Sequence, residues 1–212
     1  MYTREFWDDV YRKHFYDAPW MSNSCVRAHI SNIEKYISDF EGKFLLDYGC
    51  GNGKLAYHFY KCGASVDLAD ISDELVEWLK KKYRKHDIGI YNVATPAELR
   101  KYGKSYDIVV ATSFFHHIEP DLWKDFLLDF STILKRDGLL VIGGWDETDE
   151  VIAEDQNTAR FTGQRTWPIN AMSSVIEDMD EYEMIVNTLE DLAIDAFPRP
   201  RKMRYFVIKN SK

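Results

Sequence analysis

The chain has 212 residues, of which 45% are apolar and 15% aromatic, so it is long and apolar enough for one globular domain and is not a disordered chain. Its formal net charge of −8, from 35 acidic and 27 basic residues, disfavours a non-specific grip on nucleic acid, because such binding needs a basic surface. Three cysteines with no framework spacing, no CxxC pair and no Cys/His cluster argue against a disulfide scaffold and against a zinc site.

The first forty residues predict two helices joined by a loop. Residues 3–14 have amphipathic spacing, and residues 25–37 repeat apolar side chains at helical spacing from Val26 to Ile37. The stretch "YDAPWMSNS" between them reads as a loop. We expect residues 1–40 to form an N-terminal helical lid.

From residue 43 onward, strands and helices alternate. Apolar stretches predict strands at 43–48, 65–70, 88–93, 106–115 and 139–145. Capping and turn residues predict that helices begin near Gly53, Ser72, Thr95 and Pro120. Five such units favour a doubly wound α/β sheet, in which ligands bind beyond the carboxyl ends of the strands.

The last third of the chain departs from this alternation. Residues 146–167 are polar and irregular, and we expect them to be an insertion on the substrate side of the site. A helix is predicted at 168–179, and two closing strands are predicted at 182–194 and 202–210. We therefore expect a single domain over residues 1–212, with a seven-stranded, mostly parallel sheet whose last strand is antiparallel.

A glycine-rich loop follows the first predicted strand. Gly49, Gly51 and Gly53 can adopt positive φ and leave room for a ligand to approach the backbone. The spacing excludes a P-loop, because no GxxxxGK[ST] pattern is present. It also departs from the GxGxxG dinucleotide fingerprint, because Lys54 stands where the third glycine belongs.

Two acids frame this loop. Asp47 precedes the glycines, where it repels a pyrophosphate but suits a cationic amino group, while the loop amides can face a carboxylate. Asp70 ends the second predicted strand, where an acid can bind both ribose hydroxyls. The implied ligand is a nucleoside with an amino-acid tail and no phosphate, which describes S-adenosylmethionine (SAM).

These motifs resemble the class I SAM-dependent methyltransferases, which have a Rossmann-like fold. The resemblance rests on "LLDYGCGNGKLA" and "VDLADIS", and then on "YDIVVATSFFHHI" and "LKRDGLLVIGGW" at the fourth and fifth strands. The resemblance covers roughly residues 43–145, and the elements predicted over residues 168–209 are compatible with the same family. It implies an enzyme that transfers a methyl group from SAM and leaves S-adenosylhomocysteine (SAH).

The resemblance also implies cofactor contacts. The three loop glycines line the methionine part of SAM, Asp70 holds the ribose, Ile71 lies beside the adenine, and Ser113 lies near the methionine amino group. The family often carries an Asp-Ala pair after the third strand, but this chain reads "NVAT" there. Ala94 is therefore expected to contact the adenine through its backbone amide, with Asn92 or Thr95 replacing the missing aspartate.

Candidate catalytic residues follow the fourth strand. His116 and His117 lie where the methyl acceptor is expected, and histidine titrates near neutral pH, so either ring can act as a base when the acceptor must lose a proton. A ring packed against the next helix is the alternative for each. Tyr11 on the first helix is the expected lid contact to the sulfonium.

The acceptor itself is expected between the N-terminal segment, the end of the fifth strand and the insertion. Candidate substrate-binding residues there are aromatic or basic, namely Trp20, Trp145, Trp167 and Arg199. The basic run "PRPRKMR" offers a contact for a carboxylate or phosphate, although a solvated turn is an alternative explanation.

A small-molecule acceptor is the leading interpretation. An RNA methyltransferase is the alternative, supported by the basic run but opposed by the net charge and by "SFFHHI" in place of an NPPY-type motif. A third interpretation is a non-catalytic SAM-binding subunit. A fourth and weaker interpretation is an NAD-dependent oxidoreductase. The charged N-terminus, the short apolar runs and the cysteine pattern favour a cytoplasmic protein without a membrane span.

Overall fold

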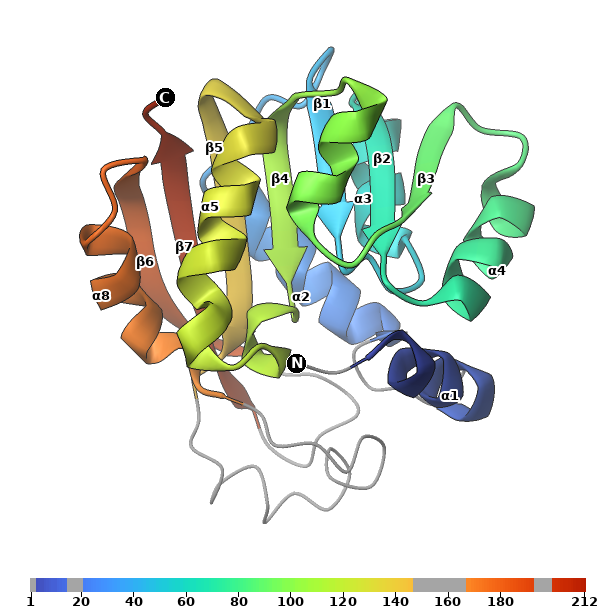
Figure 1. The fold of residues 1–212 in the computed structure, drawn as a ribbon, viewed down its shortest axis with the longest axis horizontal. Coiled ribbons are helices and arrows are strands. Elements are labelled where there is room, and N and C mark those ends of the chain that lie inside the picture. Colours follow the sequence, from blue (N-terminus) through green and yellow to red (C-terminus); the bar gives the residue numbers. More distant parts are fainter. Residues whose placement is uncertain (1–2, 15–20, 147–166, 193–199) are drawn as a thin grey trace.

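A computed structural model describes residues 3–14, 21–146, 167–192 and 200–212 (Figure 1). Within these residues, seven strands form one sheet in the order β3-β2-β1-β4-β5-β7-β6. The strands are β1 (Phe44–Tyr48), β2 (Ser65–Asp70), β3 (Ile88–Asn92), β4 (Tyr106–Thr112), β5 (Leu134–Trp145), β6 (Tyr182–Leu192) and β7 (Arg201–Asn210).

The register of the sheet confirms the predicted fold class. Strands β1 to β5 pair in parallel, whereas β7 inserts antiparallel between β5 and β6. The order reverses at β1, which has β2 on one side and β4 on the other. This is the switch point at which a doubly wound sheet opens a crevice for a ligand.

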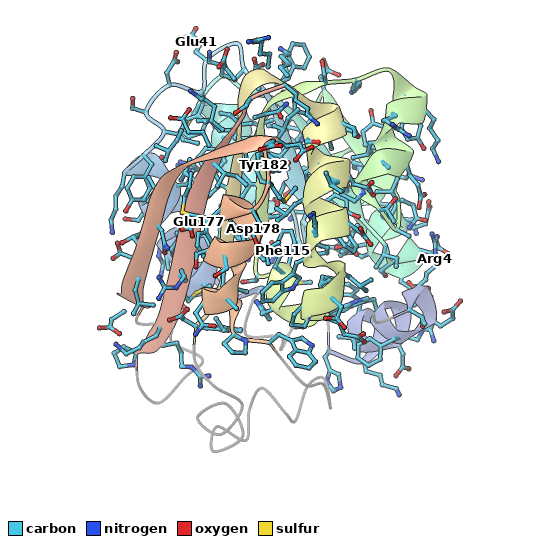
Figure 2. The ribbon with its side chains drawn as sticks, turned by 60° about the vertical axis from the view of Figure 1, so that its left-hand side comes forward. Arg4, Glu41, Phe115, Glu177, Asp178 and Tyr182 are labelled. Atoms are coloured by element: carbon cyan, nitrogen blue, oxygen red, sulfur yellow. The ribbon has the colours of Figure 1, made fainter. Side chains whose placement is uncertain are left out.

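Helices cover both faces of the sheet (Figure 1). One face carries the 3₁₀ helix η2 (Pro96–Tyr102), α5 (Trp123–Ile133) and α8 (Met172–Glu177), with Phe130 and Leu127 fully buried. Tyr182, labelled in Figure 2, ties β6 to this layer, because its hydroxyl donates to the carbonyl of Leu127 at 2.7 Å.

The other face carries α2 (Asn23–Glu34), α3 (Lys54–Lys61) and α4 (Asp73–Tyr83). Phe59, Leu68 and Leu79 are 0% exposed in this layer, and each such side chain contributes about 2 kcal/mol to stability. The first helix, α1 (Arg4–His14), packs mainly on α4.

Element boundaries differ from the sequence expectations where capping decides them. Helix α2 begins earlier than predicted because Ser22 caps it, accepting a hydrogen bond from the Cys25 amide at 3.2 Å. Strand β5 begins at Leu134, before the predicted position. The predicted helix at 168–179 is a 3₁₀ turn, η5 (Ile169–Ala171), followed by the six residues of α8.

Some predicted features lie outside the described residues. These are Trp20, Arg199 and nearly all of the expected insertion at 146–167. In the described part of the chain, no helix combines the length and the apolar character needed to cross a membrane.

Candidate functional site

A cavity opens at the carboxyl ends of β1, β2 and β4, with about 1000 Å³ of empty space including its mouth. Its wall consists of the glycine loop, the strand ends, α1 and α2. Eight of the nine predicted cofactor residues line it, namely Tyr11, Asp47, Gly49, Gly51, Asp70, Ile71, Ala94 and Ser113. The ninth, Gly53, lies outside its lining.

The three loop glycines share positive φ but have different surroundings. Gly51 has φ +50, and a Cβ there would meet only the Met21 side chain, at 3.8 Å, so its backbone faces open space. Gly53 has φ +68, and a Cβ there would lie 2.9 Å from Tyr83 and 3.0 Å from Leu68. Gly53 therefore permits α3 to pack closely on β2 and α4 and does not present backbone to the cavity.

Asp47 is a buried carboxylate in the cavity wall. It accepts a hydrogen bond from the Ala56 amide near the start of α3, while its Oδ2 atom has no hydrogen-bond partner among the described residues. Burial, opposed by that hydrogen bond and reinforced by Asp70, raises the pKa of Asp47 to about 7. A buried, unpaired carboxylate oxygen fits a cationic group and rejects a phosphate.

Asp70 lies at the end of β2, on the same cavity. Its Oδ1 atom accepts a hydrogen bond from the Ser72 amide at 3.0 Å. Burial raises the pKa of Asp70 to about 6, although backbone amides of Ser72, Gly51 and Ile71 oppose this shift. The carboxylate is thus held by backbone donors with its acceptor capacity only partly used.

The segment after β3 forms hydrogen bonds within the protein. The Ala94 amide, which we expect to contact the adenine, donates to the Glu98 carboxylate at 3.2 Å in this structure. Asn92 donates to the carbonyl of Ile71 at 3.0 Å and accepts a hydrogen bond from Arg4. Asn92 therefore fixes the backbone beside Ile71 and ties α1 to it.

A buried hydrogen-bond chain ends at Ser113. His29 Nδ1 lies 2.8 Å from the Tyr205 hydroxyl, and His29 Nε2 lies 3.1 Å from Ser113 Oγ. Burial lowers the pKa of His29 to about 4, so the ring is neutral. A neutral ring carries one proton, so one nitrogen donates and the other accepts: with Nδ1 accepting from the Tyr205 hydroxyl, Nε2 donates to Ser113 Oγ.

Ser113 Oγ is the last group of this hydrogen-bond chain. When it accepts from His29 Nε2, its own hydroxyl proton is available to a ligand in the cavity. The Ser113 backbone has φ 55, a left-handed conformation that non-glycine residues seldom adopt, and its amide donates to the Gly143 carbonyl at 2.7 Å. The fold therefore holds this hydroxyl in place at the cavity wall.

The two candidate catalytic histidines have different surroundings. His117 lines the cavity, and its ring lies 5.1 Å from that of Trp7. His116 is 2% exposed and does not line the cavity. Burial, reinforced by His117 and His29, holds the pKa of His116 well below its ordinary value. Only His117 is brought to the place where a reacting group can meet it.

Trp145 and Trp167, the described substrate candidates, surround His116 and do not line the cavity. The Trp145 ring lies 5.9 Å from the His116 ring, and the Trp167 amide donates to the His116 carbonyl at 2.9 Å. Buried Arg201 lies over Trp145, 5.3 Å from the ring centroid. The structure thus gives both tryptophans a packing role at this end of the sheet.

The remaining described cations of the basic run pair with acids. Arg204 binds Asp146 through two hydrogen bonds of 2.7 and 3.1 Å. Lys202 lies 3.3 Å from Asp191.

Helix α1 closes one side of the cavity with Trp7 and Tyr11. Asp8 fixes it to α4, because its Oδ1 atom accepts hydrogen bonds from Ser72 Oγ at 2.6 Å and from the Glu74 amide at 3.2 Å. Arg12 adds an ion pair to Glu74 at 2.8 Å. The acid at the helix N-terminus also suits the dipole of α4.

His29 is a residue of the cavity lining that the sequence patterns did not single out as part of the site. The buried residues of α2 are Ser24, Cys25, His29, Asn32 and Ile33, so most of the buried face is displaced by one residue from the expected apolar repeat, and only Ile33 belongs to both. The polar residues His29 and Asn32 are the signal, because a buried histidine or asparagine needs a hydrogen-bond partner.

A family model described as a methyltransferase domain matches residues 22–186. A ubiquinone biosynthesis O-methyltransferase from Parvibaculum lavamentivorans is 26% identical over 57% of this chain and 47% of its own length. A ribosomal protein L11 methyltransferase from Thermotoga petrophila is 31% identical over 56% of this chain and 42% of its own length. The chain thus matches less than half the length of these relatives.

The fold has a solved counterpart of similar extent. The crystal structure of a magnesium protoporphyrin IX methyltransferase from Synechocystis PCC 6803 with bound SAH matches with a TM-score of 0.70 at 16% identity. The match covers 98% of each chain. At that identity, the likeness concerns the fold.

Proposed function

The chain belongs to the methyltransferase domain family, and we propose that it binds SAM in the cavity described above and transfers its methyl group to a small-molecule acceptor. Bound SAM supplies an electrophilic methyl group on a sulfonium. The protein's own task is then to bind, orient and exclude water around the reacting atoms.

The observation that carries this proposal is Asp47, a buried carboxylate residue of the cavity lining whose Oδ2 atom has no hydrogen-bond partner among the described residues. An ammonium group of an amino-acid tail would pair with it, whereas the diphosphate of a dinucleotide would be repelled. Asp70, across the same cavity, retains acceptor capacity for two ribose hydroxyls. The pair of acids supports an aminoacyl nucleoside and opposes an NAD-dependent reaction.

The Ser113 hydroxyl is assigned to an oxygen atom in the cavity. With His29 and Tyr205 fixing its orientation, Ser113 donates a hydrogen bond to the carboxylate of the amino-acid tail. His29 and Tyr205 act through Ser113 and are positioning residues. The low pKa of His29 makes it a poor base at neutral pH.

His117 is assigned the role of base for acceptors that lose a proton on methylation. It is the histidine of the His116–His117 pair that lines the cavity. Trp7 and Tyr11 border the same space, and their rings suit a flat or apolar acceptor and a nearby sulfonium. An acceptor enclosed by these groups must be small, which fits the relative named for ubiquinone biosynthesis better than the one named for protein L11.

The domain organisation follows the same scheme. Residues 1–40 act as a lid, because α1 and α2 supply Trp7, Tyr11 and His29 to the cavity while α1 is fixed to α4 through Asp8.

The test is a search for turnover. The purified chain is incubated with SAM and separate panels of phenols, carboxylic acids, amines, a ribosomal protein fraction and RNA, and SAH release is measured by mass spectrometry. We expect release above background with at least one small-molecule class. Release only with protein or RNA would contradict the acceptor assignment, and tight SAM binding without release from any panel would favour a regulatory subunit.

A further inference from the structure

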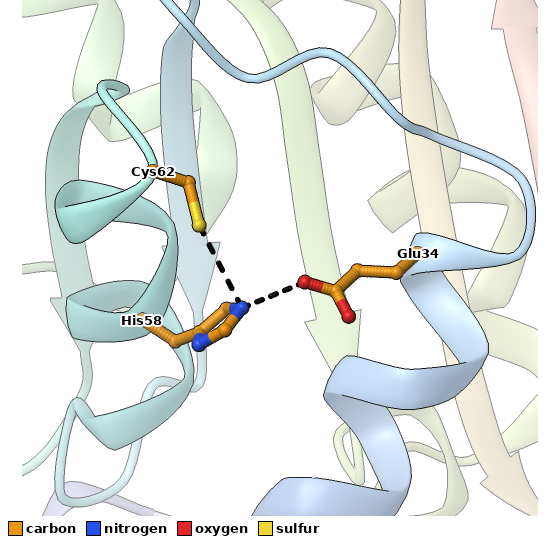
Figure 3. Close-up of side chains that lie close together, drawn as sticks. All are labelled: Glu34, His58 and Cys62. Carbon is orange, nitrogen blue, oxygen red and sulfur yellow. Dashed lines mark hydrogen bonds and ion pairs between the residues drawn. The ribbon is translucent and has the colours of Figure 1, made fainter.

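Three potential metal ligands meet on the surface between α2 and α3, away from the cavity lining (Figure 3). Glu34 is the last residue of α2, His58 lies in the last turn of α3, and Cys62 caps the end of α3. Their ligand atoms all lie within 4.8 Å of one another. The sequence predicts no metal site, because Glu34 lies 24 residues from His58 and only the fold brings it there.

We propose that Glu34, His58 and Cys62 bind one divalent transition-metal ion of the Zn²⁺ type, with water completing a tetrahedral site. One oxygen, one nitrogen and one sulfur ligand are a set that Zn²⁺ accepts. The ligand atoms also share one focus, because His58 Nε2 faces both Glu34 Oε1 and Cys62 Sγ.

The distances suit an ion placed between the three side chains. His58 Nε2 lies 2.7 Å from Glu34 Oε1 and 3.8 Å from Cys62 Sγ. Tetrahedral zinc at ordinary bond lengths needs separations of about 3.3 Å for nitrogen to oxygen and about 3.6 Å for nitrogen to sulfur. Side-chain rotations that move the ligand atoms by roughly half an ångström would bring the nitrogen–oxygen and nitrogen–sulfur pairs to those separations.

The backbone holds two of the ligands in place. His58 and Cys62 are four residues apart, so they lie on the same face of α3. The Cys62 amide donates to carbonyls of the last turn of α3, including that of His58, which fixes the position of its side chain. The site therefore needs ordering mainly of the Glu34 side chain.

Charge and access also suit a cation. The Glu34 side chain is 43% exposed and that of His58 34%, while Cys62 is exposed, so an ion and its water can reach all three. On binding, the Cys62 thiol proton is released to solvent and the metal takes its place. One carboxylate and one thiolate then balance the charge of a divalent ion, and His58 binds as a neutral ring through Nε2.

The bound metal would join the end of α2 to the end of α3. Helix α2 carries His29, which lines the cavity, and α3 begins at the glycine loop. Metal binding is therefore expected to stabilise the folded chain and to hold two walls of the cavity together.

The experiment uses the full chain, stripped with a chelator and titrated with Co²⁺ and with Zn²⁺ alone. We expect one equivalent of Co²⁺ to give a thiolate-to-metal absorption band with tetrahedral visible bands, and Zn²⁺ to displace it. Zn²⁺ should raise the melting temperature and slow alkylation of Cys62, the exposed cysteine, while Cys25 and Cys50 are buried.

Variants locate the ligands. Cys62→Ser, His58→Ala and Glu34→Gln should each weaken Zn²⁺ binding at least tenfold, and Cys62→Ser should abolish the charge-transfer band. Glu177→Gln removes an exposed acid on α8 and should bind Zn²⁺ as the unaltered chain does. Circular dichroism confirms that each surface variant is folded. Zn²⁺ binding that is absent, or that survives Cys62→Ser and His58→Ala unchanged, would overturn the proposal.

Discussion

Ser113 Oγ and His29 Nε2 lie 3.1 Å apart, and this contact joins the end of β4 to the helix that borders the cavity. Tyr205 on β7 supports it from the other side of the ring. His29 and Tyr205, which lie near opposite ends of the chain, thus hold the Ser113 hydroxyl in the cavity wall.

We expect removal of this support to weaken SAM binding. Tyr205→Phe removes the donor to His29, so Ser113 loses its fixed orientation, and the dissociation constant for SAM should rise about fivefold, as for one lost hydrogen bond. Ser113→Gly removes the hydroxyl while tolerating the left-handed backbone, and it should have the same effect. Isothermal titration calorimetry measures both.

The matched control for this prediction is Tyr182→Phe. It removes a buried tyrosine hydroxyl that donates to the Leu127 carbonyl, and neither residue lines the cavity. It should lower stability and leave SAM affinity unchanged. Equal affinity losses in Tyr182→Phe and Tyr205→Phe would show that the effect is structural and not specific to the chain of donors.

Asp47 links stability to ligand binding. The pKa of Asp47 rises from its ordinary value of 3.8 to about 7 in the folded state, so burial of the ionised carboxylate lowers the free energy of unfolding. This loss grows as pH rises from about 4 to about 7 and is constant above that. Asp47→Asn avoids this cost, and the melting temperature at pH 8 should rise by about 4 °C, with a smaller gain at pH 5.

The same substitution should weaken SAM binding. An ionised Asp47 attracts the ammonium group, so affinity of the unaltered chain should increase between pH 6 and pH 8, while Asp47→Asn should bind at least tenfold more weakly at pH 8. Calorimetric titrations at three pH values measure this. A variant that is destabilised at pH 8 yet binds SAM normally would rule out the assigned role.

His117 and His116 should separate chemistry from packing. His117→Ala is expected to slow SAH release roughly hundredfold with an acceptor that must lose a proton, with little change in SAM affinity. His116→Ala removes a buried ring and should chiefly lower the melting temperature. If turnover is unaffected by His117→Ala, the base is not at this position.

Gly53 tests the packing role of the last loop glycine. Gly53→Ala adds left-handed strain and contacts at 2.9 Å with Tyr83 and 3.0 Å with Leu68, so it should destabilise the chain by about 3 kcal/mol in urea unfolding. Gly42→Ala is the control, because Gly42 has the same φ of +68 and nothing within 4 Å. It should cost about 1 kcal/mol, and equal losses would mean that strain alone acts at Gly53.

The sequence predicted the fold and most of the cavity because these features depend on local signals. Alternating strands and helices, the glycine loop and the two strand-end acids are read directly from spacing, and the parallel sheet then brings Asp47 and Asp70 together. Gly53 shows the limit of this reasoning, since spacing reveals that a glycine is needed but not whether a ligand or a helix requires it.

Features that depend on distant pairing could not be predicted. The His29–Tyr205 contact spans 176 residues, and Glu34 meets His58 only because α2 packs on α3. His116 and His117 are adjacent in sequence but have different surroundings because of the 3₁₀ turn η3 (Phe115–His117). This turn orients the His117 ring to the cavity and buries the His116 ring. The packing of Trp145 could not be predicted for the same reason, because its packing partner Arg201 comes from the distant strand β7.

The most direct test of SAM binding in this cavity is a calorimetric titration of the unaltered chain, Asp70→Ala and Asp178→Ala with SAM and with NAD. Asp178 is an exposed acid at the end of α8 and serves as the control. We expect one equivalent of SAM to bind the unaltered chain and Asp178→Ala equally, Asp70→Ala to bind at least tenfold more weakly while remaining folded, and NAD not to bind. Unchanged SAM affinity in folded Asp70→Ala, or binding of NAD in place of SAM, would contradict the assignment of this cavity.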